Sequence, residues 1–463
     1  MVSKEQRRWT PGAAVDPVAE LGDARLVPYH WVLVGLIILA TLFDGYETLV
    51  PAYVIHFVIK PWHLAHSEAG FLVSAGLIGF AIGAIGHGPI ADKFGRRPTL
   101  IAGLVVGGVF SILTAVLAQS FAMFVLLRLL TGVGLGVLMP LGTAYINEFM
   151  PRRHSNRLAT LGTIGFSAGA VLASVLGIYL TPGRGWHILF WSGGAALPIA
   201  LLCWLFLPES VQYLTIKNRH AAAALALSRL RPADRQRYQG ATFAQARVFP
   251  REGAVIKLVT SPRYLRGTIV LWVAAFVVLF DIYGLSGWTP QIMISRGDSF
   301  AAGFSFGAIL QGMGIVGGLA AALVADRRQG RRGPLLWWLA GGTVSALVVS
   351  QLSTTATNIV FIGLSGFFII GAQFLLNNMC AHSYPTEVRG TGEGLMLGIG
   401  RIGGILGPYF GGWLLGWFGG NSAALFVAVA VATAIGAIAV VLLRPDRSPH
   451  ADRPAAEAAV IST

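Results

Sequence analysis

The chain has 463 residues, of which 55% are apolar and only 12% carry a charge. Soluble domains carry about 25% charged residues, so this composition excludes a water-soluble globule. A helix of about 20 residues crosses the ~30 Å hydrocarbon layer of a bilayer, which leaves room for about a dozen spans. The 59 glycines agree with this, because small residues let membrane helices approach closely. The composition therefore predicts an all-α membrane protein that crosses the bilayer many times.

Twelve apolar runs predict the membrane-spanning helices. In chain order, the expected spans cover residues 29–55, 69–90, 98–118, 121–146, 158–181, 187–207, 267–293, 301–324, 334–353, 357–380, 391–415 and 421–443. With the N-terminus placed in the cytoplasm, nearly all of the 34 Lys and Arg residues fall in cytoplasmic segments. The exceptions are Lys60, Arg184 and Arg296 on the outside, and Arg128 and Arg401 within spans. This asymmetry follows the positive-inside rule and predicts cytoplasmic termini, so the net charge of +14 indicates topology rather than nucleic-acid binding.

The sequence repeats itself about half a chain length later. The run Leu42–Tyr46 (Leu-Phe-Asp-Gly-Tyr) recurs as Leu279–Tyr283, and the charged loop Asp92–Arg97 recurs as Asp326–Arg332. The repetition predicts duplication of a six-helix unit, and two such halves around a midplane cavity are typical of a rocking transporter. The expected domains are a cytoplasmic N-terminal tail (1–28), an N-terminal six-helix half (29–207), a cytoplasmic central loop (208–266), a C-terminal six-helix half (267–443) and a disordered cytoplasmic tail (444–463).

Two further patterns concern packing. Segment 219–231 of the central loop has the pattern of a short amphipathic helix, which we interpret as a brace. Gly132-x-x-x-Gly136 and Gly165-x-x-x-Gly169 predict close seams between helices rather than ligand contacts.

Three short motifs lie at the ends of predicted spans. Gly88-x-x-x-Asp92-Lys93-x-Gly95-Arg96-Arg97 joins the second and third spans and resembles the signature of the major facilitator superfamily. Arg128-x-x-x-Gly132-x-Gly134 in the fourth span is similar to that superfamily's second motif. Pro208-Glu209-Ser210 after the sixth span resembles the signature that ends one half of the sugar porters and their relatives. The resemblance covers residues 25–443 and implies the major facilitator fold, with twelve transmembrane helices in two six-helix halves.

Within the superfamily, the chain resembles the aromatic acid:H⁺ symporter family. Asp44-Gly45-Tyr46-Glu47 is similar to that family's Asp-Gly-x-Asp element, with Glu47 standing where the family usually has Asp. The runs Gly398–Gly404 and Tyr384–Gly392 are similar to the family as well. By this resemblance Asp92 locks against the other half near the start of the eleventh span, where a helix N-terminus favours negative charge. Gly88, Asp92, Arg96 and Arg97 are the candidate gating residues, with Gly88 allowing close contact between helices.

Charges buried in the N-terminal half are the first candidates for a function. Asp44 and Arg128 fall at matching depths in the first and fourth spans, so we expect a charge pair between them. Burial favours a protonated carboxyl and a nearby guanidinium favours an ionised one, so such a carboxyl can load and release H⁺. Glu47 lies three residues further toward the outside, on the same face. The alternatives are a static ion pair for Asp44 and Arg128, and a solvated position at the cavity mouth for Glu47.

The C-terminal half carries a second buried cation. Arg401 lies at the midplane of the eleventh span, and Glu393 at the start of that span is too far away to neutralise it. Asp281 on the seventh span is the nearest candidate partner. Because a guanidinium can bind a carboxylate through two hydrogen bonds, Arg401 is a candidate docking site for an anionic substrate. A permanent pair between Arg401 and Asp281 is the alternative.

Other candidate substrate contacts are aromatic rings and amides near these charges. Rings suit an aromatic substrate, and amides could bind a ring hydroxyl, although both also serve in helix packing. The candidates are Phe43, Tyr46, Tyr283, Trp288, Gln373 and Asn377. Around the first outer loop, His56, His63 and His66 could sense pH or bind metal, but we interpret them as residues of a solvated loop.

The sequence therefore predicts a non-enzymatic, proton-coupled symporter that imports a small carboxylate by alternating access, and the family resemblance implies an aromatic acid. We expect the proton gradient to drive it without a cofactor or metal. The expected partners are the carboxylate, H⁺ and the lipid bilayer, with no nucleic acid, and the protein is expected to act as a monomer in the plasma (inner) membrane. A proton-antiporting exporter of drugs or organic acids, and a membrane sensor that does not transport, remain alternatives.

Overall fold

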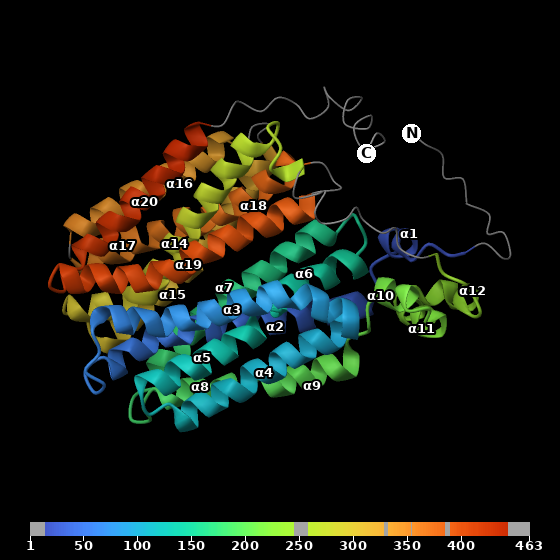
Figure 1. Cartoon of the computed structure of the whole chain (residues 1–463), viewed down its shortest axis with the longest axis horizontal. Helices are drawn as coiled ribbons and strands as arrows, with labels where there is room; N and C mark the ends of the chain where they lie inside the picture. Colours follow the sequence, from blue (N-terminus) through green and yellow to red (C-terminus); the bar gives the residue numbers. More distant parts are fainter. Residues whose placement is uncertain (1–13, 245–257, 328–331, 353, 385–388, 443–463) are drawn as a thin grey trace. The chain divides into compact units, whose positions relative to one another are not determined.

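The computed structural model describes residues 14–244, 258–327, 332–352, 354–384 and 389–442 (Figure 1). The predicted spans of the first half correspond to α2 (Pro28–Val58), α3 (His66–Phe94), α4 (Arg96–Leu117), α5 (Phe121–Leu135) with α6 (Leu138–Phe149), α7 (Ser155–Leu180), and α8 (His187–Gly193) with α9 (Ala196–Phe206). Those of the second half correspond to α14 (Leu265–Ser295), α15 (Phe300–Arg327), α16 (Arg332–Gln351), α17 (Thr355–Ser365) with η2 (Gly366–Ile370) and α18 (Gly371–Ser383), α19 (Arg389–Trp417) and α20 (Ala423–Val441).

The prediction of a helical protein with many membrane spans is confirmed. Within the described residues, 11 helices are long and apolar enough to cross a membrane. Helix α19, with 29 residues, occupies the place of the remaining predicted span. We call the side that carries the Asp92–Arg97 loop the predicted inner side, and the opposite side the predicted outer side.

Three of the predicted spans are interrupted helices. The fourth breaks between α5 and α6 at Gly136, where an added Cβ would overlap the Phe80 carbonyl of α3. The sixth breaks between α8 and α9, and the tenth contains the π-helical turn η2. Single π turns inside α-helices are frequent at functional sites. The apolar pattern alone does not reveal these breaks, because the hydrophobic run continues through each of them.

The chain folds into two compact units. Unit 1 contains the described residues of Met1–Phe249, Ser286–Gly312 and Pro408–Gly419. Unit 2 contains those of Pro250–Leu285, Met313–Gly407 and Gly420–Thr463. The parts of α14, α15 and α19 on the predicted outer side therefore belong to the same unit as the N-terminal helices. The boundaries of the two six-helix halves stay a prediction from the repeat.

Small residues form the closest helix contacts in unit 1. A Cβ added to Gly169 of α7 would overlap the Leu42 carbonyl of α2, and one on Gly165 would meet the Thr41 hydroxyl. A Cβ on Gly132 of α5 would overlap the Gly76 carbonyl of α3. The predicted glycine seams are confirmed, and they hold α2 against α7 and α3 against α5 at backbone contact distance.

In unit 2, glycines likewise allow close contact between α14 and α19. A Cβ added to Gly403 or Gly407 of α19 would overlap the carbonyl of Phe276 or Phe280, respectively. Helix α16 packs along α20, where Gly342 borders the methyl group of Thr433. These contacts fix the rotation of α14, α19 and α20 about their axes, which decides where their polar side chains point.

Short helices on the predicted inner side brace unit 1. They are α1 (Pro17–Gly22), α10 (Val211–Ile216), α11 (His220–Leu230), η1 (Pro232–Asp234) and α12 (Arg235–Tyr238). The predicted amphipathic helix of the central loop is α11, which buries Ala223, Leu227 and Leu230. Glu20 of α1 forms salt bridges with Arg231 and Arg237 (3.1 Å for the latter).

The N-terminal segment is therefore bound to the central loop. The amide of Val15 donates to the carbonyl of Thr242 over 2.8 Å, and the amide of Ala244 donates to the carbonyl of Val15 over 2.9 Å. The Tyr238 hydroxyl donates to Glu20 over 2.8 Å, and burial together with this acid raises the pKa of Tyr238.

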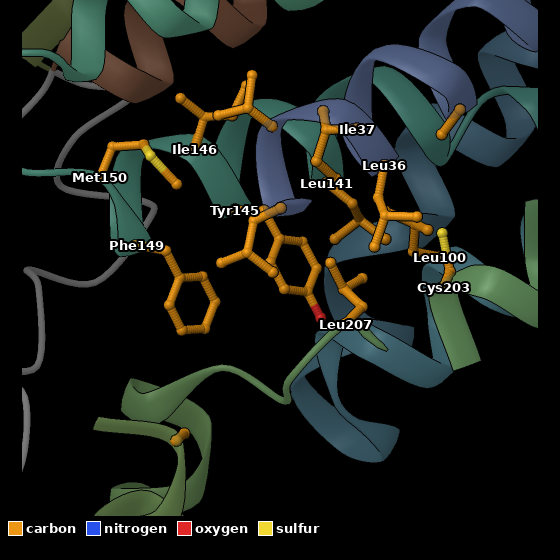
Figure 2. Close-up of a cluster of buried hydrophobic side chains, with 14 of the residues drawn as sticks. Leu36, Ile37, Leu100, Leu141, Tyr145, Ile146, Phe149, Met150, Cys203 and Leu207 are labelled. Atoms are coloured by element: carbon orange, nitrogen blue, oxygen red, sulfur yellow. The ribbon is translucent and has the colours of Figure 1, made fainter. Parts of the chain in front are cut away.

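A buried apolar cluster connects these short helices to the membrane-spanning part of unit 1 (Figure 2). It brings together Leu36 and Ile37 of α2, Leu100 of α4 and Leu141 of α6. Tyr145 of α6 lies in its midst, and its hydroxyl donates to the carbonyl of Pro208 over 3.2 Å. The cluster holds the segment after α9 against α6 and so positions the acidic residues described below.

Candidate substrate and proton sites

The most deeply buried charge pair in unit 1 joins Glu47 of α2 to Arg128 of α5. Arg128 Nη1 lies 2.7 Å from Glu47 Oε2, and the side chains of Arg128 and Glu47 are 1% and 0% exposed, respectively. The Ser111 hydroxyl of α4 donates to Glu47 Oε1 over 2.5 Å. Arg128 Nη2 also donates to the backbone carbonyl of Glu47 over 2.6 Å. Three hydrogen bonds thus stabilise a pair whose charges would otherwise be very costly to bury, while Arg128 Nε has no hydrogen-bond partner among the described residues.

This pairing corrects two expectations from the sequence. The Arg128 salt bridge was expected at Asp44, and Glu47 was given a solvated position at the cavity mouth as its alternative. The salt bridge of Arg128 is formed with Glu47 and not with Asp44, and the alternative of a solvated Glu47 was wrong, because Glu47 is fully buried. Residues three apart on a helix differ in height by only about 4.5 Å but in direction by about 60°. Depth along the helix therefore could not show whether Asp44 or Glu47 pairs with Arg128.

Asp44 remains a buried acid close to this pair. It is 0% exposed, and the Thr48 hydroxyl donates to its Oδ1 over 3.4 Å. Asp44 and Thr48 lie one turn apart on α2. Between them, Gly45 packs against the Phe166 backbone of α7 so closely that a Cβ would overlap it. The two acids thus share one stretch of α2 whose position is fixed by α7.

The candidate aromatic residues of the first span lie inside unit 1. The ring of Phe43 lies against α4, 3.1 Å from where a Cβ of Gly107 would stand. The Tyr46 hydroxyl donates to the carbonyl of Leu189 in α8 over 2.7 Å. Both residues are buried, and the Arg128 guanidinium lies 5.4 Å from the ring centre of Phe190. The Phe190 ring therefore lies beside the Glu47–Arg128 pair, and Phe43 and Tyr46 pack against α4 and α8.

Arg401 of α19 is placed against Tyr283 of α14 in unit 2. Its Nη1 donates to the Tyr283 hydroxyl over 2.8 Å, and its guanidinium carbon lies 5.9 Å from that ring's centre. Asp281 Oδ2 lies 2.8 Å from the Thr433 hydroxyl of α20 instead. The expected alternative of an Arg401–Asp281 pair is therefore wrong. Residues two apart on a helix point about 200° apart, so with Tyr283 facing α19, Asp281 faces α20.

The remaining candidate contacts divide between the two units. In unit 2, the Gln373 amide donates to Asn377 Oδ1 over 2.8 Å along α18, and the buried Gln373 Oε1 lacks a hydrogen-bond partner among the described residues. In unit 1, the indole of Trp288 donates to the Pro408 carbonyl over 2.8 Å and stacks on His66. The indole nitrogen of Trp288 is therefore committed to the backbone of α19.

Contacts on the predicted outer side join α2 and α3 to α14, α15 and α19 within unit 1. His56 Nδ1 lies 3.1 Å from Gln291 Oε1, and the ring of Tyr53 lies 4.9 Å from that of Phe304. His56 and His66 are half-buried in these contacts, so the interpretation as a solvated loop was wrong for both, whereas His63 is exposed. No group of three metal-ligating side chains occurs among the described residues.

The charged loop on the predicted inner side is organised by two glutamates that the sequence analysis did not select. Arg96 forms a salt bridge with Glu148 of α6, which also accepts hydrogen bonds from the Ser210 hydroxyl at 2.8 Å. Glu209 Oε1 accepts from the backbone amides of Arg96 and Arg97 over 3.0 and 3.2 Å. Burial raises the pKa of Glu209, and these amide donors oppose the shift. The Pro-Glu-Ser motif was the signal that pointed here.

The other two gating candidates lie on the surface of the described structure. Asp92 is exposed at the end of α3, and the Arg97 guanidinium bonds to the Trp204 carbonyl. A Cβ built on Gly88 would meet no described atom within 4 Å. The close helix contact expected at Gly88 is therefore not present among the described residues. The roles of all four gating candidates stay predictions.

Comparison with known proteins now decides the family. The model of the Major Facilitator Superfamily matches residues 35–408 and 375–462. The chain belongs to this superfamily. It is therefore a multi-pass membrane transport protein rather than an enzyme, and the resemblance read from the loop motif is confirmed.

Similar proteins cover nearly the whole chain. A 4-hydroxybenzoate transporter, PcaK, of Acinetobacter baylyi is 33% identical over 413 residues, which are 88% of this chain and 90% of that protein. A gallate transporter of Pseudomonas putida is 34% identical over 412 residues, 87% of this chain and 89% of that protein. The structure of the E. coli xylose transporter XylE, in a partially occluded inward-open conformation, aligns with TM-score 0.70 at 17% identity, covering 91% and 99% of the two chains. The last likeness concerns the fold alone.

Proposed function

We propose that the protein imports a small aromatic carboxylate together with H⁺ by alternating access. The relatives described as transporters of 4-hydroxybenzoate and gallate support the substrate class, because they are 33–34% identical over at least 87% of this chain. A benzoate transport protein of Acinetobacter baylyi is 30% identical over 401 residues and supports the same class. The substrates named for all three are aromatic acids.

The observation that carries the proton coupling is the buried pair of Glu47 and Arg128. A fully buried carboxylate is stable as an anion only while the guanidinium stays 2.7 Å away. Protonation of Glu47 removes that attraction, while the hydrogen bond from Arg128 to the Glu47 backbone carbonyl remains. A proton on this residue thus changes how α2 is held to α5, which links H⁺ binding to helix movement. Asp44, one turn away on α2, is the second candidate for the same proton.

In this proposal the substrate carboxylate docks at Arg401. The guanidinium of Arg401 can bind a carboxylate through two parallel hydrogen bonds. One of its contacts is the neutral hydroxyl of Tyr283, which an anionic group can displace or bridge. The Tyr283 ring, next to the guanidinium, can stack on the aromatic ring of the substrate. Gln373, whose Oε1 is buried without a described partner, can accept a hydrogen bond from a ring hydroxyl.

The two ends of the helices would then open in turn. Closure on the outside would use the contacts of His56 with Gln291 and of His66 with Trp288, which lie within unit 1. Closure on the inside would use Asp92, which is exposed at the end of α3, in the gating role that the family resemblance implies. The protein would work as a monomer in the inner membrane with cytoplasmic termini, with the proton gradient as its driving force and without a cofactor.

Uptake into proteoliposomes tests this proposal. Purified protein is reconstituted, and entry of radiolabelled 4-hydroxybenzoate is followed with the outside acidic, with the gradient reversed, and with no gradient. We expect accumulation only with the outside acidic, and competition by benzoate and gallate but not by xylose. Accumulation only with the inside acidic would indicate an exporter, and binding without entry would indicate a sensor. Protein-free liposomes control for diffusion of the neutral acid.

A further inference from the structure

The Thr433 hydroxyl lies within hydrogen-bond distance of two oxygen atoms, one of them on Asp281, and its single proton cannot serve both contacts. Thr433 Oγ1 lies 2.8 Å from Asp281 Oδ2 and 2.7 Å from the carbonyl oxygen of Val429. A hydroxyl has a single proton to donate, and a carbonyl oxygen can only accept. If the hydroxyl donates to Val429, then the short contact with Asp281 needs a proton on the carboxyl. A protonated Asp281 that donates to Thr433 satisfies both contacts at once.

The surroundings of Asp281 point the same way. The residue is 0% exposed, and its other oxygen, Oδ1, has no hydrogen-bond partner among the described residues. An ionised carboxylate there would have at most one hydrogen-bond donor in the described part of the chain, the Thr433 hydroxyl, which also contacts the Val429 carbonyl. A buried charge with so little compensation is very costly. A neutral carboxylic acid avoids the cost of burying a charge. Its Oδ1 still lacks a hydrogen-bond partner within the described structure, but an unsatisfied neutral oxygen costs far less than an isolated charge.

The charged groups on neighbouring helices have other partners or lie toward the helix ends. Helix α20 contains no titratable residue between Ala423 and Val441. On α16 the charged residue is Arg332, whose guanidinium bonds to the Val441 carbonyl at the end of α20. On α19, Arg389 and Glu393 lie in the first turns and interact with each other. Arg401 of α19 donates to Tyr283, on the other face of α14.

Asp281 lies near the middle of α14 (Leu265–Ser295), one of the helices long and apolar enough to cross a membrane. It stands about 24 Å along α14 from Leu265, at 1.5 Å per residue. A wholly apolar groove of about 480 Å³ lies next to this position. It is lined by, among others, Val277 and Phe280, which neighbour Asp281 on α14, and Ala432, which precedes Thr433 on α20. The groove next to Asp281 is therefore lined by apolar side chains.

The internal repeat relates Asp281 to the acid of the first half. Leu279-Phe280-Asp281 repeats Leu42-Phe43-Asp44, so the two acids occupy equivalent positions on α14 and α2. Both are fully buried, and both are within hydrogen-bond distance of a threonine hydroxyl. Each half of the chain thus places one acid at the same level of its first helix.

We propose that Asp281 is a second proton-binding site, occupied in this conformation and emptied during the transport cycle. The inference rests on the proposed function, since it adds a proton to the same cycle. The step is simple protonation: the carboxylate takes H⁺ from water on one side of the membrane, and the O–H bond breaks to return H⁺ to water on the other. No other bond changes. The proton on Asp281 ties α14 to α20 through Thr433, and its loss releases that contact.

An exchangeable proton explains the choice of an acid at this position. A permanent link between α14 and α20 needs only a neutral donor, which asparagine would supply at the same size. Ionisable residues inside the membrane are costly, and those that occur there usually mark ion pathways or proton relays. The one property that aspartate adds to asparagine is the ability to lose its proton.

Infrared spectroscopy tests the occupied site without any transport assay. The carbonyl stretch of a protonated carboxyl is separate from that of a carboxylate, and we expect it in the wild type at neutral pH. Asp281→Asn should remove one such band. Thr433→Val keeps Asp281 and removes its acceptor, so the band should shift, whereas Thr343→Val on α16 should leave it in place. Thr343 is the matched control, because its hydroxyl donates to the Leu339 carbonyl of its own helix. A spectrum unchanged by both Asp281→Asn and Thr433→Val overturns the proposal.

The proton count tests the exchange. The H⁺:substrate ratio is measured from the membrane potential at which net uptake in proteoliposomes reverses. We expect Asp281→Asn to move one proton fewer per substrate than the wild type, while Thr343→Val keeps the wild-type ratio. An equal ratio in wild type and Asp281→Asn overturns the exchange while leaving proton-coupled uptake intact. If Asp281→Asn does not fold, the band shift in Thr433→Val still decides whether the site holds a proton. Uptake by the wild type that ignores the pH gradient contradicts the proposed function instead.

Discussion

Replacing Arg128 by methionine removes the cation that faces Glu47 while leaving the carboxyl fully buried. Methionine fills a similar volume, so the chief change is the loss of charge and of two hydrogen bonds, one to the Glu47 side chain and one to its backbone carbonyl. The Ser111 hydroxyl remains as a donor to the stranded carboxyl. The Arg128→Met variant thus isolates the contribution of the guanidinium.

The expected loss of stability is large for a single substitution. Breaking a buried ion pair from one side costs about 3–5 kcal/mol, because the remaining charge has no partner in a low-dielectric site. The Ser111 donor keeps part of the stabilisation, which places the loss near 3 kcal/mol, at the lower end of that range. In the double variant Glu47→Gln/Arg128→Met no charge is stranded. Its loss should therefore shrink to about 1 kcal/mol, similar to that of one neutral hydrogen bond.

Chemical unfolding in detergent micelles, followed by circular dichroism, measures these differences. The wild type is compared with the single variant, the double variant and Arg229→Met. Arg229 is an exposed guanidinium 5.9 Å from the ring centre of Tyr29, so its replacement should cost about 0.5–1 kcal/mol. A loss at Arg128 no larger than the loss at Arg229 would refute the reasoning. A double variant less stable than the single one would refute it as well.

Three further predictions concern substrate binding, gating and packing. Arg401→Lys should raise the KM for the aromatic acid about tenfold, because an ammonium cannot form two parallel hydrogen bonds and the loss of one costs about 1.5 kcal/mol; an unchanged KM in initial-rate uptake would count against docking at Arg401. Asp92→Asn should slow turnover and leave KM unchanged, and an increase in KM alone would exclude a gating role. Gly169→Val should destabilise the protein by about 1–3 kcal/mol, since its Cβ would overlap the Leu42 carbonyl, and an unchanged thermal midpoint would contradict that seam.

Much of the fold could be predicted from the sequence, because length and apolarity decide which segments cross a bilayer. The predicted span 29–55 corresponds to Pro28–Val58, and 421–443 to Ala423–Val441. The glycine seams were predictable for the same reason, since close backbone approach requires a residue without a side chain. The breaks inside the fourth, sixth and tenth spans were not, because they depend on how neighbouring helices pack and not on local hydropathy.

The sequence could show which residues belong to the candidate site, but not which of them contact one another. The sequence places Asp44, Glu47 and Arg128 at similar depths, but the choice of partner depends on the rotation of α2. That rotation is set by the contacts of Gly45 with α7, which join residues far apart in the chain. The same holds for Asp281, which faces Thr433 because α14 is rotated by its contacts with α19. Rotation about a helix axis is a tertiary property, whereas depth follows from counting residues.

The central claim is that substrate and H⁺ cross the membrane together, and substrate-induced proton movement tests it most directly. Proteoliposomes with equal pH on both sides enclose a pH-sensitive dye, and 4-hydroxybenzoate is added outside while valinomycin and K⁺ hold the membrane potential at zero. We predict that the interior acidifies faster than in protein-free liposomes, and that Glu47→Gln removes this excess. Entry of labelled substrate at the wild-type rate without excess acidification would contradict the account.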